Sequence, residues 1–110
     1  MERYDIDEMI KECERKRMPD EAIVFAVGSG RIVPKFGMKK KMKEAFEYIK
    51  SLEGFVGFHS VDLWHTLLLF DSKSNAICGR NMMEHKGIPV GTYVVPVMVK
   101  KIFLMKEVEK

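Results

Sequence analysis

The stretch from residue 66 to residue 99 constrains the fold most, because a strand, a capped helix and a second strand follow one another within it. Residues 66–70 are an apolar run of strand length. A helix is expected from about residue 75 to residue 86, and Gly87 can adopt the left-handed conformation that ends it. Residues 93–99 form a second strand, rich in β-branched side chains. Three side chains can serve as the N-cap of the helix: Asp71, Ser72 and Ser74.

The first half of the chain supplies the remaining elements of the core. Residues 22–27 are six consecutive apolar residues, which is typical of a central strand, and Gly28-Ser29-Gly30 reads as the turn after it. A long helix ends at Gly54. A strand follows over residues 55–60, with Phe55, Gly57 and His59 expected on one side. The apolar face of that helix carries Met38, Met42, Ala45, Phe46, Ile49 and Leu52.

A short helix precedes this core. Asp5 followed by Glu8 is similar to a capping box, and the helix ends near Met18-Pro19. Its apolar stripe consists of Ile6, Met9, Ile10 and Cys13.

The predicted order is therefore one helix followed by β-α-β-β-α-β, which is the order of a ferredoxin-like split βαβ sandwich. We expect an α+β fold of this kind with an extra N-terminal helix. A single domain covers residues 1–110, with the N-terminal helix in 1–19, the sandwich core in 20–101 and a charged tail in 102–110. Two helices would cover one face of the antiparallel sheet. The strand at 93–99 is apolar on both sides, so the other face also needs a cover; we favour the N-terminal helix over a second subunit. Pro96 has no N–H to donate, which places this strand at an edge or a bulge.

Composition limits the partners and the compartment. A chain of 110 residues can bury a core without disulfides or metals. No apolar run approaches the roughly 20 residues that span a bilayer, and the charged N-terminus does not resemble a signal peptide, so no membrane partner is expected. Cys13 and Cys78 indicate reduced thiols and a cytoplasmic location. The net charge of +3 is too small to predict nucleic-acid binding by itself. We expect no cofactor.

A basic cluster is the first candidate site, because residues 31–43 contain six basic residues and no acidic residue. Lys39 and Lys43 lie one turn apart on the predicted helix, and Lys40 lies beside that row. Cations at a helix start oppose the helix dipole, so stability alone does not explain them. The cluster predicts contact with an anion, an acidic protein or a nucleic acid, or else a solvated face. Its members are Arg31, Lys35, Lys39, Lys40, Lys41 and Lys43.

The predicted hairpin over residues 59–65 is the second candidate site. Leu63 and Trp64 lie near its tip, where a large aromatic side chain either folds back onto the sheet or anchors a partner. The Gly28-Ser29-Gly30 segment could cradle a phosphate, but a plain hairpin turn fits it better, because no helix opens directly after it.

The histidines of the same hairpin raise the question of a metal. His59 and His65 could lie opposite each other, with Asp62 at the tip. A divalent ion would still need Cys78 or His85 from the following helix to reach four ligands. Nothing in the spacing requires this arrangement, so we predict neither a metal site nor a catalytic residue.

The element order resembles that of the RNA-recognition motif, whose third strand carries a basic-Gly-aromatic-x-aromatic signature. Here His65 and Leu67 would occupy the two stacking positions, and the similar string Gly54-Phe55-Val56-Gly57-Phe58 falls on the preceding strand. The aromatic side chains on which RNA bases stack are therefore largely absent. The resemblance covers topology alone, so RNA stacking on the sheet is not expected. The chain is also similar in element order to small dimeric α/β-barrel proteins, which pair two sheets face to face around a cavity.

These patterns leave three classes of function open. The leading hypothesis is a non-catalytic regulatory or inhibitory protein that docks on a protein partner, such as a nucleic-acid enzyme, through the basic cluster and the Leu63-Trp64 tip. The second is a nucleic-acid-binding module that uses the same lysines. The third is a homodimeric α/β barrel that senses a small ligand or acts as an enzyme in its cavity.

Overall fold

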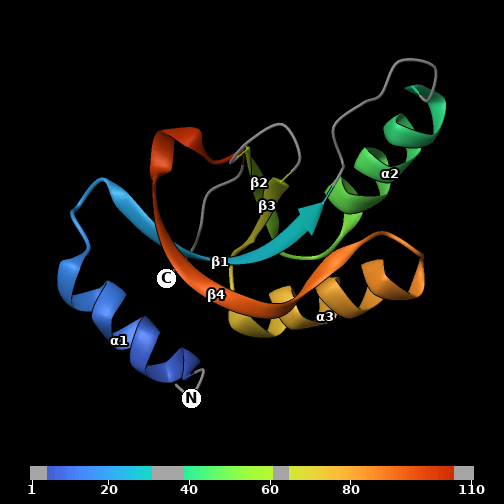
Figure 1. Cartoon of the computed structure of the whole chain (residues 1–110). Coiled ribbons are helices and arrows are strands. Elements are labelled where there is room, and N and C mark those ends of the chain that lie inside the picture. Colours follow the sequence, from blue (N-terminus) through green and yellow to red (C-terminus); the bar gives the residue numbers. More distant parts are fainter. Residues whose placement is uncertain (1–4, 31–38, 61–64, 106–110) are drawn as a thin grey trace.

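The computed structural model describes residues 5–30, 39–60 and 65–105, in which helices and strands alternate along the chain (Figure 1). Within these ranges the chain forms three α-helices and a four-stranded antiparallel sheet, so the expected mixture of α and β structure is confirmed. None of these helices has the length and apolar character needed to cross a bilayer. The elements in order are α1 (Ile6–Lys16), β1 (Glu21–Gly30), α2 (Lys39–Ser51), β2 (Phe55–Ser60), β3 (His65–Phe70), α3 (Lys73–His85), β4 (Val90–Lys100) and the 3-10 turn η1 (Lys101–Phe103).

The strands lie in the order β2-β3-β1-β4, and each neighbouring pair runs antiparallel. The apolar strand β1 is interior, as its sequence predicts. Strand β4 is at the edge, which confirms the expectation from Pro96; this residue lies opposite Phe25 of β1. The helices α2 and α3 each connect two strands that have a third strand between them.

The prediction of a turn at Gly28-Ser29-Gly30 is wrong, because β1 continues through these residues. Ser29 pairs with Thr66 of β3 on one side and with Val90 of β4 on the other. A register shift opposite β4, between Val27 and Ser29, absorbs the irregularity without ending the strand.

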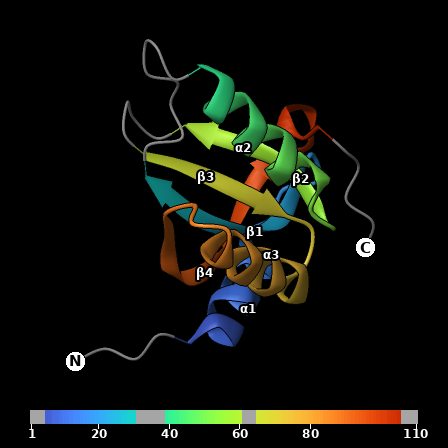
Figure 2. The ribbon, with the colours of Figure 1, turned by 90° about the vertical axis from the view of Figure 1, so that its right-hand side faces the viewer.

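One face of the sheet packs against α2 and α3 and forms the larger core (Figure 2). Ile49 of α2 and Met83 of α3 are fully buried between the helices and the strands. Burial of this many large apolar side chains is the main force that holds the two layers together. The buried members of this core are Phe25, Val27, Ile49, Leu52, Phe55, Leu68, Phe70, Ala76, Met83 and Val94.

Helix α1 lies on the same face as α2 and α3, which corrects the expectation that it covers the opposite face. Its Ile6 and Ile10 pack against the larger core, and Cys13 Sγ lies 3.9 Å from the carbonyl oxygen of Pro96 in β4. In Figure 1, α1 and α3 lie on one side of β4. The apolar stripe of α1 fits either side of β4, because that strand is apolar on both, so the sequence pattern could not choose between the faces.

The face of the sheet opposite the three α-helices, here called the open face, carries a smaller apolar cluster. Its buried members are Ala22, Val24, Ala26, Val56 and Leu69. Leu104, which follows η1, packs against this cluster. Half-buried side chains at its margin are Leu67, Val95, Val97 and Val99.

A bulge changes the expected alternation of side chains in β2. The register with β3 shifts between Phe55 and Gly57, so Phe55 and Phe58 reach the same face although three positions separate them. Their ring centroids are 4.8 Å apart in an edge-on arrangement, and Phe46 of α2 lies 5.1 Å from Phe58. The expected grouping of Phe55 with Gly57 and His59 is therefore wrong.

The helix caps follow the sequence closely. Among the three candidates before α3, Ser72 is the N-cap: its side chain accepts the N–H of Asn75 at 3.2 Å. The helix consequently begins two residues earlier than expected, at Lys73. Gly87 follows the helix with φ +88°, in the left-handed region. Asp5 caps α1 by accepting the N–H of Glu8 at 3.2 Å.

Candidate functional site

The structure describes part of the predicted basic cluster, at the start of α2. Lys39 and Lys40 are the first two residues of the helix, and Lys43 follows one turn later with an exposed side chain. The first turn of α2 contains no acidic residue. Arg31 and Lys35 lie outside the described residues. Lysines are thus gathered at a helix end where the main-chain N–H groups already favour an anion.

The Leu63-Trp64 tip lies outside the described residues, as does Asp62, so the tip stays a prediction. The strands that lead to and from it are described. His59 is exposed and lies opposite Leu67, while His65 is exposed and lies opposite Gly30 of β1. The two histidines are therefore not opposite each other across the β2–β3 pair, contrary to expectation.

Among the described residues, the metal ligands considered from the sequence are divided between the two faces of the sheet. Cys78 and His85 belong to α3, on the helix-covered face. His59 is paired with Leu67, a residue of the open face. Over residues 5–30, 39–60 and 65–105, no group of three or more His, Cys, Asp or Glu side chains is placed to hold a metal ion.

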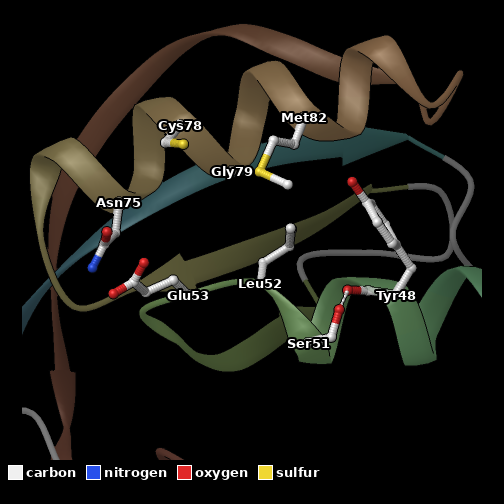
Figure 3. A pocket seen from close by; sticks show the side chains of 8 residues that line it. All are labelled: Tyr48, Ser51, Leu52, Glu53, Asn75, Cys78, Gly79 and Met82. Carbon is white, nitrogen blue, oxygen red and sulfur yellow. Dashed lines mark hydrogen bonds between the residues drawn. The ribbon is translucent and has the colours of Figure 1, made fainter.

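A groove of about 220 Å³ runs between α2 and α3 (Figure 3). Tyr48 and Leu52 point from α2 toward α3, and Met82 points from α3 toward α2. Gly79 lies in the floor of the α3 side of this groove, and its lack of a side chain lets α3 approach Phe70 of the sheet closely. The lining residues are Tyr48, Ser51, Leu52, Glu53, Asn75, Cys78, Gly79 and Met82.

Local contacts fix the walls of this groove. Asn75 Nδ2 donates to Asp71 Oδ1 at 2.9 Å. Lys86 Nζ lies 4.7 Å from the centroid of the Tyr48 ring, a cation–π contact. Two lining residues on α3 are exposed: Cys78, a free thiol, and Met82, whose side chain is 46% exposed. The groove therefore offers a soft, partly apolar contact surface.

A second hollow of about 390 Å³ lies where β1, β3 and β4 meet near the irregularity in β1. The Ser29 hydroxyl donates to the Pro89 carbonyl oxygen at 2.7 Å and so ties β1 to the segment that enters β4. The hydroxyl is used structurally, which agrees with a close-packed strand end rather than a phosphate cradle. The lining residues are Gly28, Ser29, His65, Thr66, Leu67, Pro89, Val90 and Gly91.

The two cysteines have different surroundings, and both are free thiols. Cys13 is half-buried between α1 and β4. Burial raises the pKa of the Cys13 thiol, and the nearby positive charge of Lys16 offsets part of that rise. Because the thiolate is the nucleophile, this shift lowers the reactivity of Cys13, in agreement with its half-buried position against β4.

Sequence reasoning missed an apolar surface at the end of the described chain. We name Ile102, Phe103 and Met105 the C-terminal patch; their side chains are 82%, 67% and 57% exposed. We expected a charged tail from residue 102 onward. The signal was present, because residues 102–105 are four consecutive apolar residues directly after two lysines.

Comparison of the chain with protein families, with curated proteins and with solved structures found no match. Function is therefore inferred from the chain's own residues and their arrangement.

Proposed function

We propose that this protein is a small binding protein, without a catalytic role, that docks on an acidic surface of a protein partner. One observation carries the proposal: α2 begins with Lys39, Lys40 and Lys41, adds Lys43 one turn on, and has no acidic residue in its first turn. Cations in this position oppose the helix dipole, so the arrangement weakens the helix unless an anionic surface binds there. A regulatory or inhibitory protein directed at a nucleic-acid enzyme would have such a partner, because those enzymes bind polyanions and can be met by charge complementarity.

The Leu63-Trp64 tip belongs to the same proposal as an apolar anchor that acts in addition to the lysines. Interfaces commonly combine a few buried aromatic anchors with a charged rim. The lysines would steer the encounter, and the tryptophan would supply the part of the affinity that resists salt.

We further propose that the architecture is the ferredoxin-like split βαβ sandwich. The sheet order β2-β3-β1-β4 supports it, since β1-α2-β2 and β3-α3-β4 are each split by one intervening antiparallel strand. This assignment adds nothing about activity, because one fold hosts many functions.

A triple charge reversal tests the function. Lys39→Glu, Lys40→Glu and Lys43→Glu together should abolish capture of the partner from a lysate of the source organism and leave the melting temperature within a few degrees. The matched control reverses Lys11, Lys16 and Lys50, three exposed helical lysines away from the start of α2, and should retain the partner. Each of these lysines pairs with a glutamate one turn earlier, so the melting temperature of the control is measured as well. Equal retention by the two triple variants would refute docking through α2, and collapse of the fold would show that these lysines are structural.

Direct nucleic-acid binding is the outcome that would replace this proposal. Fluorescence anisotropy with a random single strand and a random duplex, at low and at physiological salt, separates the two. Tight binding that weakens steeply with salt would make the lysines a phosphate site. If neither oligonucleotide binds at low salt, direct nucleic-acid binding is excluded, and an acidic protein partner remains the reason for the lysines at the start of α2.

A further inference from the structure

Ile102 and Phe103 of the C-terminal patch are the two most exposed large apolar side chains in the described ranges, at 82% and 67%. Met18, Tyr93 and Met105 follow at 59%, 58% and 57%. Met18 and Tyr93 have no other such side chain within four positions in the sequence, whereas the three members of the patch lie within four positions. The largest apolar patch on the surface of a domain is often functional, so the C-terminal patch is a candidate contact surface.

The segment that carries the patch is held at both ends by main-chain hydrogen bonds. The N–H of Lys101 donates to the Asp20 carbonyl at 2.9 Å, and the N–H of Met105 donates to the Val56 carbonyl in β2 at 2.7 Å. Between them, the N–H of Leu104 donates to the Lys101 carbonyl at 3.1 Å. The patch side chains are therefore presented outward from a fixed turn, and little conformational entropy is lost when they bind.

The patch borders the open face of the sheet. Leu104 packs against the cluster on that face, and residues 103–105 pass 3.8–3.9 Å from the position of a Cβ on Gly57. Leu67, Val95, Val97 and Val99 on this face are only half-buried. Figure 1 shows η1 on the side of β4 away from α1 and α3. The patch and the open face thus lie on the same side of the sheet.

We propose that the C-terminal patch, together with the half-buried margin of the open face, is the interface through which two copies of the chain associate. Charge favours a second copy over a polyanion or an anionic membrane. At the corner where β4 ends, exposed Lys100 and Lys101 lie beside exposed Asp20, and Glu21 is the strand partner of Lys100. When two copies of this rim face each other, the lysines of one copy can lie against the carboxylates of the other. A polyanion or an anionic membrane would instead be repelled by those carboxylates.

The exposed area of the patch is about half of what one side of a stable dimer interface needs. A large apolar side chain has roughly 200 Å² of surface, so the exposed parts of the three patch residues amount to roughly 400 Å², whereas a stable interface buries roughly 800 Å² on each partner. The central side chains of the open face are at most 5% exposed and add nothing. The rest of the interface would therefore have to come from the half-buried margin of that face and from the charged rim.

Sedimentation velocity over a wide range of protein concentration, in a reducing buffer that prevents disulfide formation through exposed Cys78, tests the proposal. We expect a reversible monomer–dimer equilibrium. The double variant Ile102→Ser with Phe103→Ser should raise the dissociation constant by roughly tenfold or more. The matched control, Ile77→Ser with Met82→Ser, removes two exposed apolar side chains from α3 and should leave the constant unchanged. Circular dichroism confirms that each variant is folded.

Two results would overturn this assignment. A monomer at every concentration rules out self-association, and a dimer that the double variant does not weaken places the interface elsewhere. If the native protein co-sediments with vesicles of phosphatidylcholine and phosphatidylserine and the double variant does not, the patch binds a membrane surface and not a second copy. None of these residues belongs to the lysines of α2, so either surface can fail its test alone.

Discussion

At the residue scale, Gly79 sets the distance between α3 and the sheet. A Cβ on this residue would lie 2.7 Å from Cε2 and Cζ of Phe70, whose side chain is fully buried. Glycine is unfavourable inside a helix by up to about 1 kcal/mol relative to alanine. The close approach of the helix to a core phenylalanine is the reason that glycine occupies the position.

Gly79→Ala should therefore destabilise the protein although it improves helix propensity. We expect a loss of about 1–3 kcal/mol in the free energy of unfolding, because neither the helix backbone nor the buried ring can move aside without strain. Urea denaturation measures it. Gly28→Ala is the control: a Cβ there meets no atom within 4 Å, and its effect should stay within about 0.5 kcal/mol. Similar losses in both variants would show that packing against Phe70 is not the cause.

At the element scale, the start of α3 depends on one side chain among three chemically similar candidates. Ser72 accepts the N–H of Asn75, whereas Ser74 lies within the helix and is exposed. Ser72→Ala should lower the free energy of unfolding by about 1 kcal/mol, the usual contribution of an N-cap. Ser74→Ala removes a hydroxyl that lies 3.4 Å from Ser72 Oγ but keeps the Ser72 oxygen that accepts the N–H of Asn75, so thermal denaturation should show a smaller change. A larger effect at Ser74 would mean that the helix begins later in solution.

Elements with a local signature could be predicted from the sequence, and arrangements that depend on contacts between distant residues could not. Caps, glycine stops and apolar periodicity located all three α-helices and four strands of the described chain, and Pro96 placed β4 at an edge. The bulge in β2 reversed the expected faces because Phe55, Val56 and Gly57 read equally well as a regular strand. The face covered by α1 was missed because its stripe is compatible with both. At the candidate sites, the lysines of α2 were visible as a charge run, but the C-terminal patch was hidden within a tail that was judged by its charge.

At the scale of the whole molecule, the two proposed surfaces are compatible with each other. In Figure 1 the start of α2 and η1 lie at opposite ends of the molecule, and α2 packs on the helix-covered face rather than the open one. Association through the C-terminal patch would therefore leave the lysines of both copies accessible. A dimer would present two basic helix starts, which raises the apparent affinity for a partner that carries two acidic sites.

Association of this kind has a thermodynamic consequence that involves the entire chain. If two folded copies unfold to two separate chains, mass action makes the melting temperature rise with total protein concentration. Differential scanning calorimetry should detect this rise in the native protein and in the Ile77→Ser, Met82→Ser control. In the Ile102→Ser, Phe103→Ser variant the dependence should begin only at higher protein concentration, in line with the weaker association, while the cooperative transition persists, because both side chains are exposed and contribute little to the core. A melting temperature that is independent of concentration in the native protein would contradict association through the C-terminal patch.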